Sequence, residues 1–331
     1  MCIYANRSLL RREWMALAAG GCFGNAAVIP FQRGVNYTAE FPDGYGSERA
    51  RQILQSLPKF GVNAVAFVPY GFAPKGEPSV RFSGARGLER DDAIAKLSSL
   101  ARSAGIKVLL KPQLWLRGGS TTDINFTKEA QRRQWFQQYR LFLEHYAKLA
   151  ADIRADLFCV GVEFAGMAPY EAEWRALIQR ARQIYPGKLT YAANFGPEFE
   201  TTQFWDALDY VGLNNYYPLP DDLSTAKVVA RVEAVHKKFG KPVIFPEVGF
   251  ASLEAPHRQP WDETPRKLSP EAQAHCYEAV FKGFYHKPWF EGIYWWKVGT
   301  NGFGGLEDGS HTPWNKPAMK VVTQWYLRGG R

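Results

Sequence analysis

Short apolar runs alternate with helix-like segments along most of this chain, and this alternation limits the folds that it can adopt. The runs typical of buried strands cover residues 34–37, 64–69, 107–113, 157–162, 189–194, 210–213, 243–245 and 293–296. The segments typical of helices cover residues 47–57, 88–104, 135–153, 170–185, 224–239, 270–286 and 317–326. Alternating strands and helices predict a parallel sheet, and eight strands in this arrangement predict its closure. We therefore expect an α/β protein with a single (β/α)8 (TIM) barrel.

The first 27 residues have the pattern of an export signal. Arg11 and Arg12 precede a short apolar run that ends in small residues at Cys22. Paired arginines of this kind are typical of twin-arginine signals, and the residues before Cys22 resemble a lipoprotein cleavage site. We expect a leader at residues 1–27 and the barrel at residues 28–331. The protein would then be periplasmic, extracellular, or tethered to a membrane through a lipidated Cys22. The alternative is an amphipathic helix that packs on the barrel floor.

Charge and composition limit the classes of molecule that the protein is expected to bind. The net charge of +9 comes from residues spread along the chain, with no basic run interleaved with aromatics, so we expect no nucleic-acid partner. A hydrophobic content of 46% excludes a disordered chain. The eleven Trp and sixteen Tyr favour a carbohydrate site, because such rings have one apolar face and a polar edge. We expect a monomer.

Two carboxylates follow buried strands of the same design. Glu163 directly follows the apolar run at residues 157–162, and Glu247 follows the apolar run at residues 243–245. A carboxylate at the end of a buried strand is costly unless it has partners or a catalytic task. A single case would be a salt-bridged structural glutamate, but two indicate a paired-carboxylate active site.

In a (β/α)8 barrel the active site lies at the carboxyl ends of the strands. The candidate substrate-binding residues at those ends are Asn36, Tyr37, Tyr70, Lys111, Gln113, Trp115, Asn194, Tyr216, Tyr217, Trp295 and Trp296. Any one of them could belong to the core, but together they predict a binding rim.

Other chemistries lack their motifs. The six His are scattered without a His-x-x-x-His pair, so we expect no metal. Gly302, Gly304 and Gly305 follow the last strand instead of opening a first unit, so we expect no dinucleotide and no other cofactor. Cys159 and Cys276 are expected to be buried thiols without a disulfide.

Paired carboxylates suit glycosidic bond cleavage. One protonates the leaving oxygen while the other acts on the opposite side of the sugar, as a nucleophile in retaining enzymes. The strands that carry Glu163 and Glu247 face each other across an eight-stranded barrel, so the pair can straddle a sugar. We expect Tyr216 to donate a hydrogen bond to Glu247, and Trp295 or Trp296 to lie under the ring.

An ordered set of segments is similar to glycoside hydrolase family 113. The segments cover residues 155–164, 204–213, 216–219, 241–249, 292–296 and 312–318, within a match from about Gly34 to Tyr326. The resemblance implies a clan A (β/α)8 glycosidase that retains configuration, with Glu163 as acid/base and Glu247 as nucleophile. It also implies activity on β-1,4-mannosidic linkages of mannan-type polysaccharide, in the manner of an endo-β-1,4-mannanase.

Two alternatives stay open from the residues. The same chemistry would serve a β-glucan, an oligosaccharide, or an anionic wall polymer that suits the positive charge. A non-catalytic carbohydrate-binding barrel would keep the aromatic rim without needing the carboxylate pair.

Overall fold

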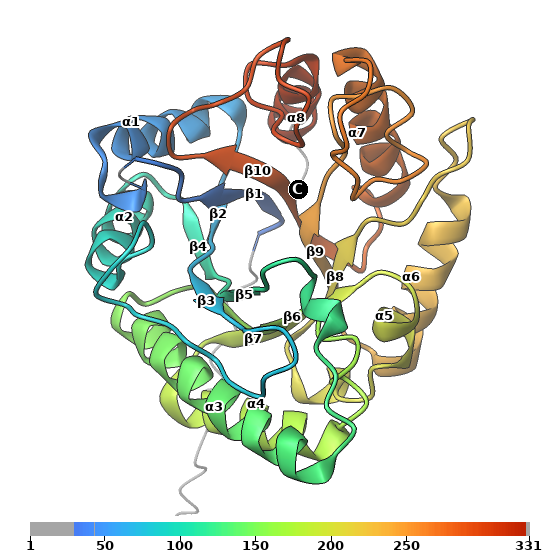
Figure 1. Ribbon diagram of the computed structural model, residues 1–331. Helices are drawn as coiled ribbons and strands as arrows, with labels where there is room; N and C mark the ends of the chain where they lie inside the picture. The colour runs from blue at the N-terminus through green and yellow to red at the C-terminus, as the bar shows by residue number, and fades with distance from the viewer. Residues whose placement is uncertain (1–29, 43, 329–331) are drawn as a thin grey trace, which may run out of the picture. The chain divides into compact units, whose positions relative to one another are not determined.

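Eight parallel strands close into a barrel in the computed structural model, which describes residues 30–42 and 44–328 (Figure 1). Around the barrel the order is β1, β10, β9, β8, β7, β6, β4 and β2. The barrel strands are β1 (Gln32–Thr38), β2 (Ala64–Phe67), β4 (Lys107–Leu110), β6 (Leu157–Val162), β7 (Lys188–Asn194), β8 (Tyr210–Asn215), β9 (Val243–Val248) and β10 (Phe290–Gly299). The fold class expected from the sequence is confirmed. The expected leader, with Cys22, lies outside the described residues.

Helices surround the barrel (Figure 1). They are α1 (Glu48–Ser56), α2 (Asp91–Ser103), α3 (Glu129–Asp152), α4 (Glu171–Ile184), α5 (Pro197–Thr201), α6 (Ala226–Phe239), α7 (Pro270–Phe284) and α8 (Pro317–Leu327). Local signals set their ends. The Ser47 side chain accepts a hydrogen bond from the Ala50 backbone N–H at the start of α1, 3.0 Å away. Gly240 ends α6 in the left-handed conformation that glycine adopts without steric cost.

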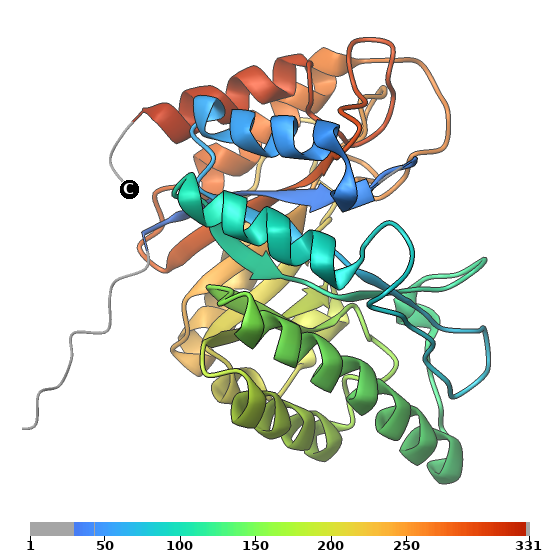
Figure 2. The same ribbon diagram turned by 90° about the vertical axis from the view of Figure 1, so that its left-hand side faces the viewer.

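Two prolines separate barrel strands from short outer strands that the sequence analysis did not predict. Pro69 separates β2 from β3 (Tyr70–Phe72), and Pro112 separates β4 from β5 (Gln113–Trp115). Proline lacks the N–H that a strand ladder needs. β3 and β5 pair in parallel as a small second sheet, and the loops that follow the barrel strands extend on the same side of the barrel (Figure 2).

Aromatic side chains fill the layer between the barrel and the helices. Trp174 of α4 is fully buried, and its indole N–H donates to the Met167 carbonyl at 3.0 Å. Its ring contacts Tyr191 of β7 and Tyr139 of α3, with centroid distances of 5.1 and 5.7 Å. Much of the aromatic content that favoured a carbohydrate site therefore serves the core.

Two further findings concern thiols and membranes. Cys159 and Cys276 are free and buried, as the sequence predicts. Within residues 30–42 and 44–328, none of the helices combines the length and the apolar character needed to cross a membrane.

Replacing Trp174 with Ala should lower the free energy of unfolding by about 3–5 kcal/mol, because the change leaves a large cavity between α3, α4 and β7. Urea unfolding followed by circular dichroism measures this loss. Trp115→Ala is the matched control, since Trp115 is 53% exposed and its loss should change stability by about 0.5 kcal/mol or less. Equal destabilisation by the two variants would contradict this account of the core.

Candidate active site

A cavity of about 410 Å³ opens where β6, β7, β8, β9 and β10 end. Glu163 and Glu247, the two predicted carboxylates, both line it. The complete lining consists of Ser120, Thr122, Glu163, Asn194, Phe195, Tyr216, Glu247, Trp261, Glu263, Trp296 and His311. The structure therefore brings the carboxylates from β6 and β9 into one concave site.

The backbone of β9 is irregular at Glu247. Pro246 precedes it, and the register of β9 shifts at this point against both neighbouring strands, between Ile293 and Trp295 of β10 and between Gly212 and Asn214 of β8. A bulge of this kind bends a strand and redirects a side chain, and proline fits there because it has no ladder hydrogen to give. The bulge accounts for a carboxylate that points into the cavity.

Three donors hold the carboxylate of Glu247. Lys111 Nζ lies 2.7 Å from Oε2, and Gln113 Nε2 donates to the same oxygen at 3.3 Å. The Tyr216 hydroxyl donates to Oε1 at 2.7 Å, which confirms the predicted hydrogen bond. Lys111 is fully buried, so its charge is compensated by Glu247 and by the face of Trp296, whose ring centroid lies 5.0 Å from Nζ.

Glu163 has a strained backbone. Its φ is 56°, in the left-handed region that residues other than glycine rarely adopt. The next residue fixes this turn, because the Phe164 N–H donates to the Tyr191 hydroxyl at 3.0 Å, and that hydroxyl donates in turn to buried Glu198. Gly161 permits the approach, since a Cβ there would lie 2.6 Å from the Tyr191 ring. Such outliers persist where the surroundings over-determine them.

The environment of Glu163 differs from that of Glu247. Its pKa is raised to about 7, first by burial and then by the negative charge of Glu247. Asn214 Nδ2 donates to Glu163 Oε1 at 3.0 Å and opposes the rise, as does the charge of Lys111. Glu163 is thus protonated up to about neutral pH beside an ion-paired Glu247. This combination provides a proton donor and a nucleophile in one cavity.

Several of the expected rim residues either bind Glu247 or line the cavity. Lys111, Gln113 and Tyr216 bind Glu247, while Asn194 and Trp296 line the cavity. Tyr70 lies near enough for the charge of Glu247 to raise the pKa of its hydroxyl, although burial is the larger cause.

Eight of the expected binding residues are outside the cavity lining, and five of these make their contacts in other parts of the fold. Tyr37 is buried and donates to the Ala50 carbonyl behind β1, and Trp295 is buried in a stack on Tyr277 of α7, 3.7 Å between centroids. Side chains alternate across a strand, so Trp296 faces the cavity and Trp295 cannot. Tyr217 donates to Glu200, Asn36 donates to two backbone carbonyls, and exposed Trp115 packs beside Phe72.

Sequence reasoning missed several residues that line the cavity or bind its carboxylates. Asn214 belongs to β8, which was expected to end at Leu213. Trp261, Glu263 and His311 come from long connections without periodicity, where no sequence pattern marks them. One sequence feature could have identified Asn214 as a site residue: it lies directly before Asn215 and Tyr216 at the end of a predicted strand.

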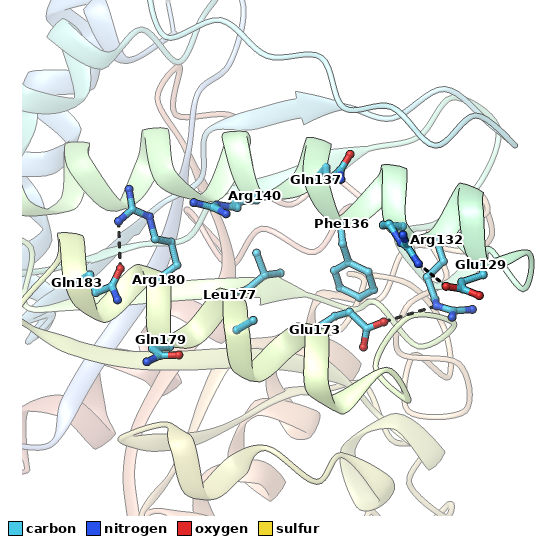
Figure 3. Close-up of a pocket in the computed structure, with 12 residues that line it drawn as sticks. Glu129, Arg132, Phe136, Gln137, Arg140, Glu173, Leu177, Gln179, Arg180 and Gln183 are labelled. Carbon is cyan, nitrogen blue, oxygen red and sulfur yellow. Dashed lines mark hydrogen bonds and ion pairs between the residues drawn. The ribbon is translucent and has the colours of Figure 1, made fainter.

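A second hollow, of about 510 Å³, lies outside the barrel between α3 and α4 (Figure 3). Its charged groups already have partners. Arg132 Nε lies 3.6 Å from Glu173 Oε1, and Arg180 Nη1 donates to Gln183 at 3.1 Å (Figure 3). Neither predicted carboxylate reaches this hollow. Among the described residues we find no group of three or more His, Cys, Asp or Glu able to hold a metal ion.

The model of Glycoside Hydrolase Family 113 matches residues 37–307. Among curated proteins, nothing matches the chain. A solved structure of the GH113 β-mannanase from Alicyclobacillus acidocaldarius, in complex with ManMIm, is 32% identical. The match covers 90% of this chain and 98% of that one, with a TM-score of 0.84.

Two more solved structures show how far the similarity extends. A GH113 β-1,4-mannanase is 26% identical over 91% of this chain and 100% of that one, with a TM-score of 0.83. A β-glucuronidase from an uncultured Clostridium is 14% identical over 91% of this chain and 50% of that one, with a TM-score of 0.63. The last similarity shows a shared fold alone.

The charge of Glu247 should control the protonation of Glu163. In Glu247→Gln that charge is absent, so the pKa of Glu163 should fall. Carbon-13 NMR titration of labelled glutamate carboxyls measures the change. Glu263→Gln is the control, because Glu263 lines the cavity but is not among the groups that shift the pKa of Glu163. A Glu163 pKa that is the same in wild type and Glu247→Gln would contradict this coupling.

Proposed function

The chain belongs to glycoside hydrolase family 113, and we propose that it cleaves β-1,4-mannosidic linkages in mannan-type polysaccharide with retention of configuration. Both similar family structures carry the name β-mannanase, and they align along almost their whole length with this chain. The substrate class is therefore a β-linked mannan or its oligosaccharides.

The observation that carries the proposal is the unequal carboxylate pair. Glu163 keeps a proton to about pH 7, whereas Glu247 faces the ammonium of Lys111 and the hydroxyl of Tyr216. Glycoside hydrolysis with retention needs one carboxylic acid and one carboxylate nucleophile. A barrel that only binds sugar needs neither this pairing nor the cost of burying it.

In the first step, a Glu247 oxygen attacks the anomeric carbon while Glu163 transfers its proton to the leaving oxygen. The glycosidic C–O bond breaks, and the products are a glycosyl ester on Glu247, an ionised Glu163 and the released sugar, whose hydroxyl carries the proton. Because the ester is neutral, the charge that raised the pKa of Glu163 is gone, and its carboxylate becomes a stable general base.

In the second step, Glu163 removes a proton from water as the water oxygen attacks the anomeric carbon. The C–O bond to Glu247 breaks, and its carboxylate returns to Lys111, Gln113 and Tyr216. Asn214 assists both steps, since its amide N–H stabilises the ionised form of Glu163. Trp296 presents its ring beside the pair, where it can support the face of a sugar.

Wild-type protein should release reducing sugar from galactomannan or glucomannan, and Glu247→Ala should lose orders of magnitude in rate, because the covalent route needs the nucleophile. Glu163→Ala should lose activity on mannan but still release dinitrophenol from an aryl mannobioside, whose leaving group needs no proton. Glu129→Ala is the control, since Glu129 is an exposed residue at the start of α3. Activity on cellulosic β-glucan instead of mannan would contradict the substrate, and full activity of Glu247→Ala would contradict the mechanism.

We also propose that residues 1–27 are an export leader and that the mature protein is a monomer outside the cytoplasm. The paired Arg11 and Arg12 and the small residues before Cys22 support export. Mass spectrometry of protein expressed in a bacterial host should find a shortened chain. If Cys22 is lipidated, Cys22→Ala should release the protein from the membrane fraction, whereas Cys276→Ala should not. A full-length chain that stays in the cytoplasm would contradict export.

A further inference from the structure

An aromatic platform lies beside the carboxylate pair. Trp261, in the connection between β9 and α7, is 48% exposed and lines the same cavity as Glu163 and Glu247. One face of its ring stacks on Phe195, with centroids 5.1 Å apart and planes inclined by 21°. The opposite face is left for another planar or ring-shaped group.

Residues behind the platform hold it in place. Phe195 packs edge-on against Tyr217, with centroids 5.6 Å apart. The Tyr217 hydroxyl donates to Glu200 at 2.8 Å, and Arg231 lies 2.7 Å from the same carboxylate. Tyr217, expected from the sequence to bind substrate, therefore supports the ring that faces the cavity.

A third cavity carboxylate lies two residues beyond Trp261. Glu263 Oε1 accepts from the His311 backbone N–H at 2.9 Å and lies 2.5 Å from His311 Nδ1. The bond to His311 is the main reason that the pKa of Glu263 is lowered to about 2, so the ionised form of this side chain is favoured. Both contacts use Oε1, which leaves Oε2 for a hydroxyl donor.

The segment that carries Trp261 and Glu263 is tied down at several points. The ring Nε2 of His311 lies 2.6 Å from the Pro260 carbonyl oxygen. Arg266 pairs with Asp262 at 2.7 Å, and Leu253 forms an antiparallel bridge with Leu268. These bonds fix the segment to the rest of the fold, so a sugar that binds here needs to order little of the protein.

We infer that Trp261, Phe195 and Glu263 form a subsite for the sugar on the leaving-group side of the cleaved bond. Phe195 directly follows Asn194 at the end of β7, the strand next to β6, and β6 carries the residue that protonates the leaving oxygen. The exposed ring face suits the C–H face of a pyranose, and the free carboxylate oxygen suits its hydroxyls. This inference rests on the proposed function and names where the second sugar binds.

The test compares two substrates that differ only in the leaving group. Trp261→Ala should lower kcat/KM for mannotetraose by about tenfold, the value of one good aromatic contact. The same variant should hydrolyse dinitrophenyl β-mannobioside at the wild-type rate, because the aryl group needs no sugar subsite. It should also transfer fewer mannobiosyl groups from this aryl substrate to added mannobiose, because the acceptor sugar binds on the leaving-group side.

Two further variants keep the test independent of folding defects. Trp261→Phe retains a ring and should recover much of the mannotetraose activity, and Glu263→Gln should show the same substrate-selective loss as Trp261→Ala. Equal losses on both substrates, or no loss on mannotetraose, would overturn the subsite while leaving the proposed function standing. Wild-type protein inactive on both substrates would overturn the proposed function, and the subsite with it.

Discussion

The ion pair between Lys111 and Glu247 is the interaction on which the rest of the site depends. Removing two charges from water costs several kcal/mol per ion, and the cost is recovered only with close geometry and further hydrogen bonds. Here Lys111 is fully buried, its Nζ lies 2.7 Å from the carboxylate, and Tyr216 and Gln113 complete the donors. The charge held in this way also raises the pKa of Glu163. One fixed carboxylate therefore adds to the effect of burial in raising the pKa of the other.

Both carboxylates lie where the strands depart from regular geometry. Pro246 interrupts the ladder of β9 just before Glu247, and Glu163 leaves β6 with a φ of 56°. Each departure is held by different neighbours, the first by Lys111 and Tyr216 and the second by Tyr191. Departures from regular geometry at strand ends that carry such side chains are typical of functional sites.

The sequence predicted the barrel because apolar strands and helices alternate with clear boundaries. It also placed both glutamates at strand ends and the Tyr216 hydroxyl on Glu247. It could not separate Trp295 from Trp296, because a strand that is apolar on both faces does not show which residue points inward. The segment with Trp261 and Glu263 has no hydrophobic periodicity. Its place in the cavity depends on contacts with His311, which lies 48 residues after Glu263 in the chain. Long-range contacts of this kind leave no local signal.

The closure of the barrel has a consequence for when the active site forms. The Asn36 amide donates to the carbonyls of Pro246 and Tyr294, across 210 and 258 positions of the chain. These bonds join the first strand to β9 and β10, so they require the closure of a loop that spans most of the chain. Folding rates fall as contacts become less local, and chains of this size fold through intermediates. We therefore expect the bulge that directs Glu247 to be completed late in folding. In a nascent chain that lacks β10, the site around the two carboxylates is incomplete. During refolding, the time at which activity appears would therefore report when the barrel closes.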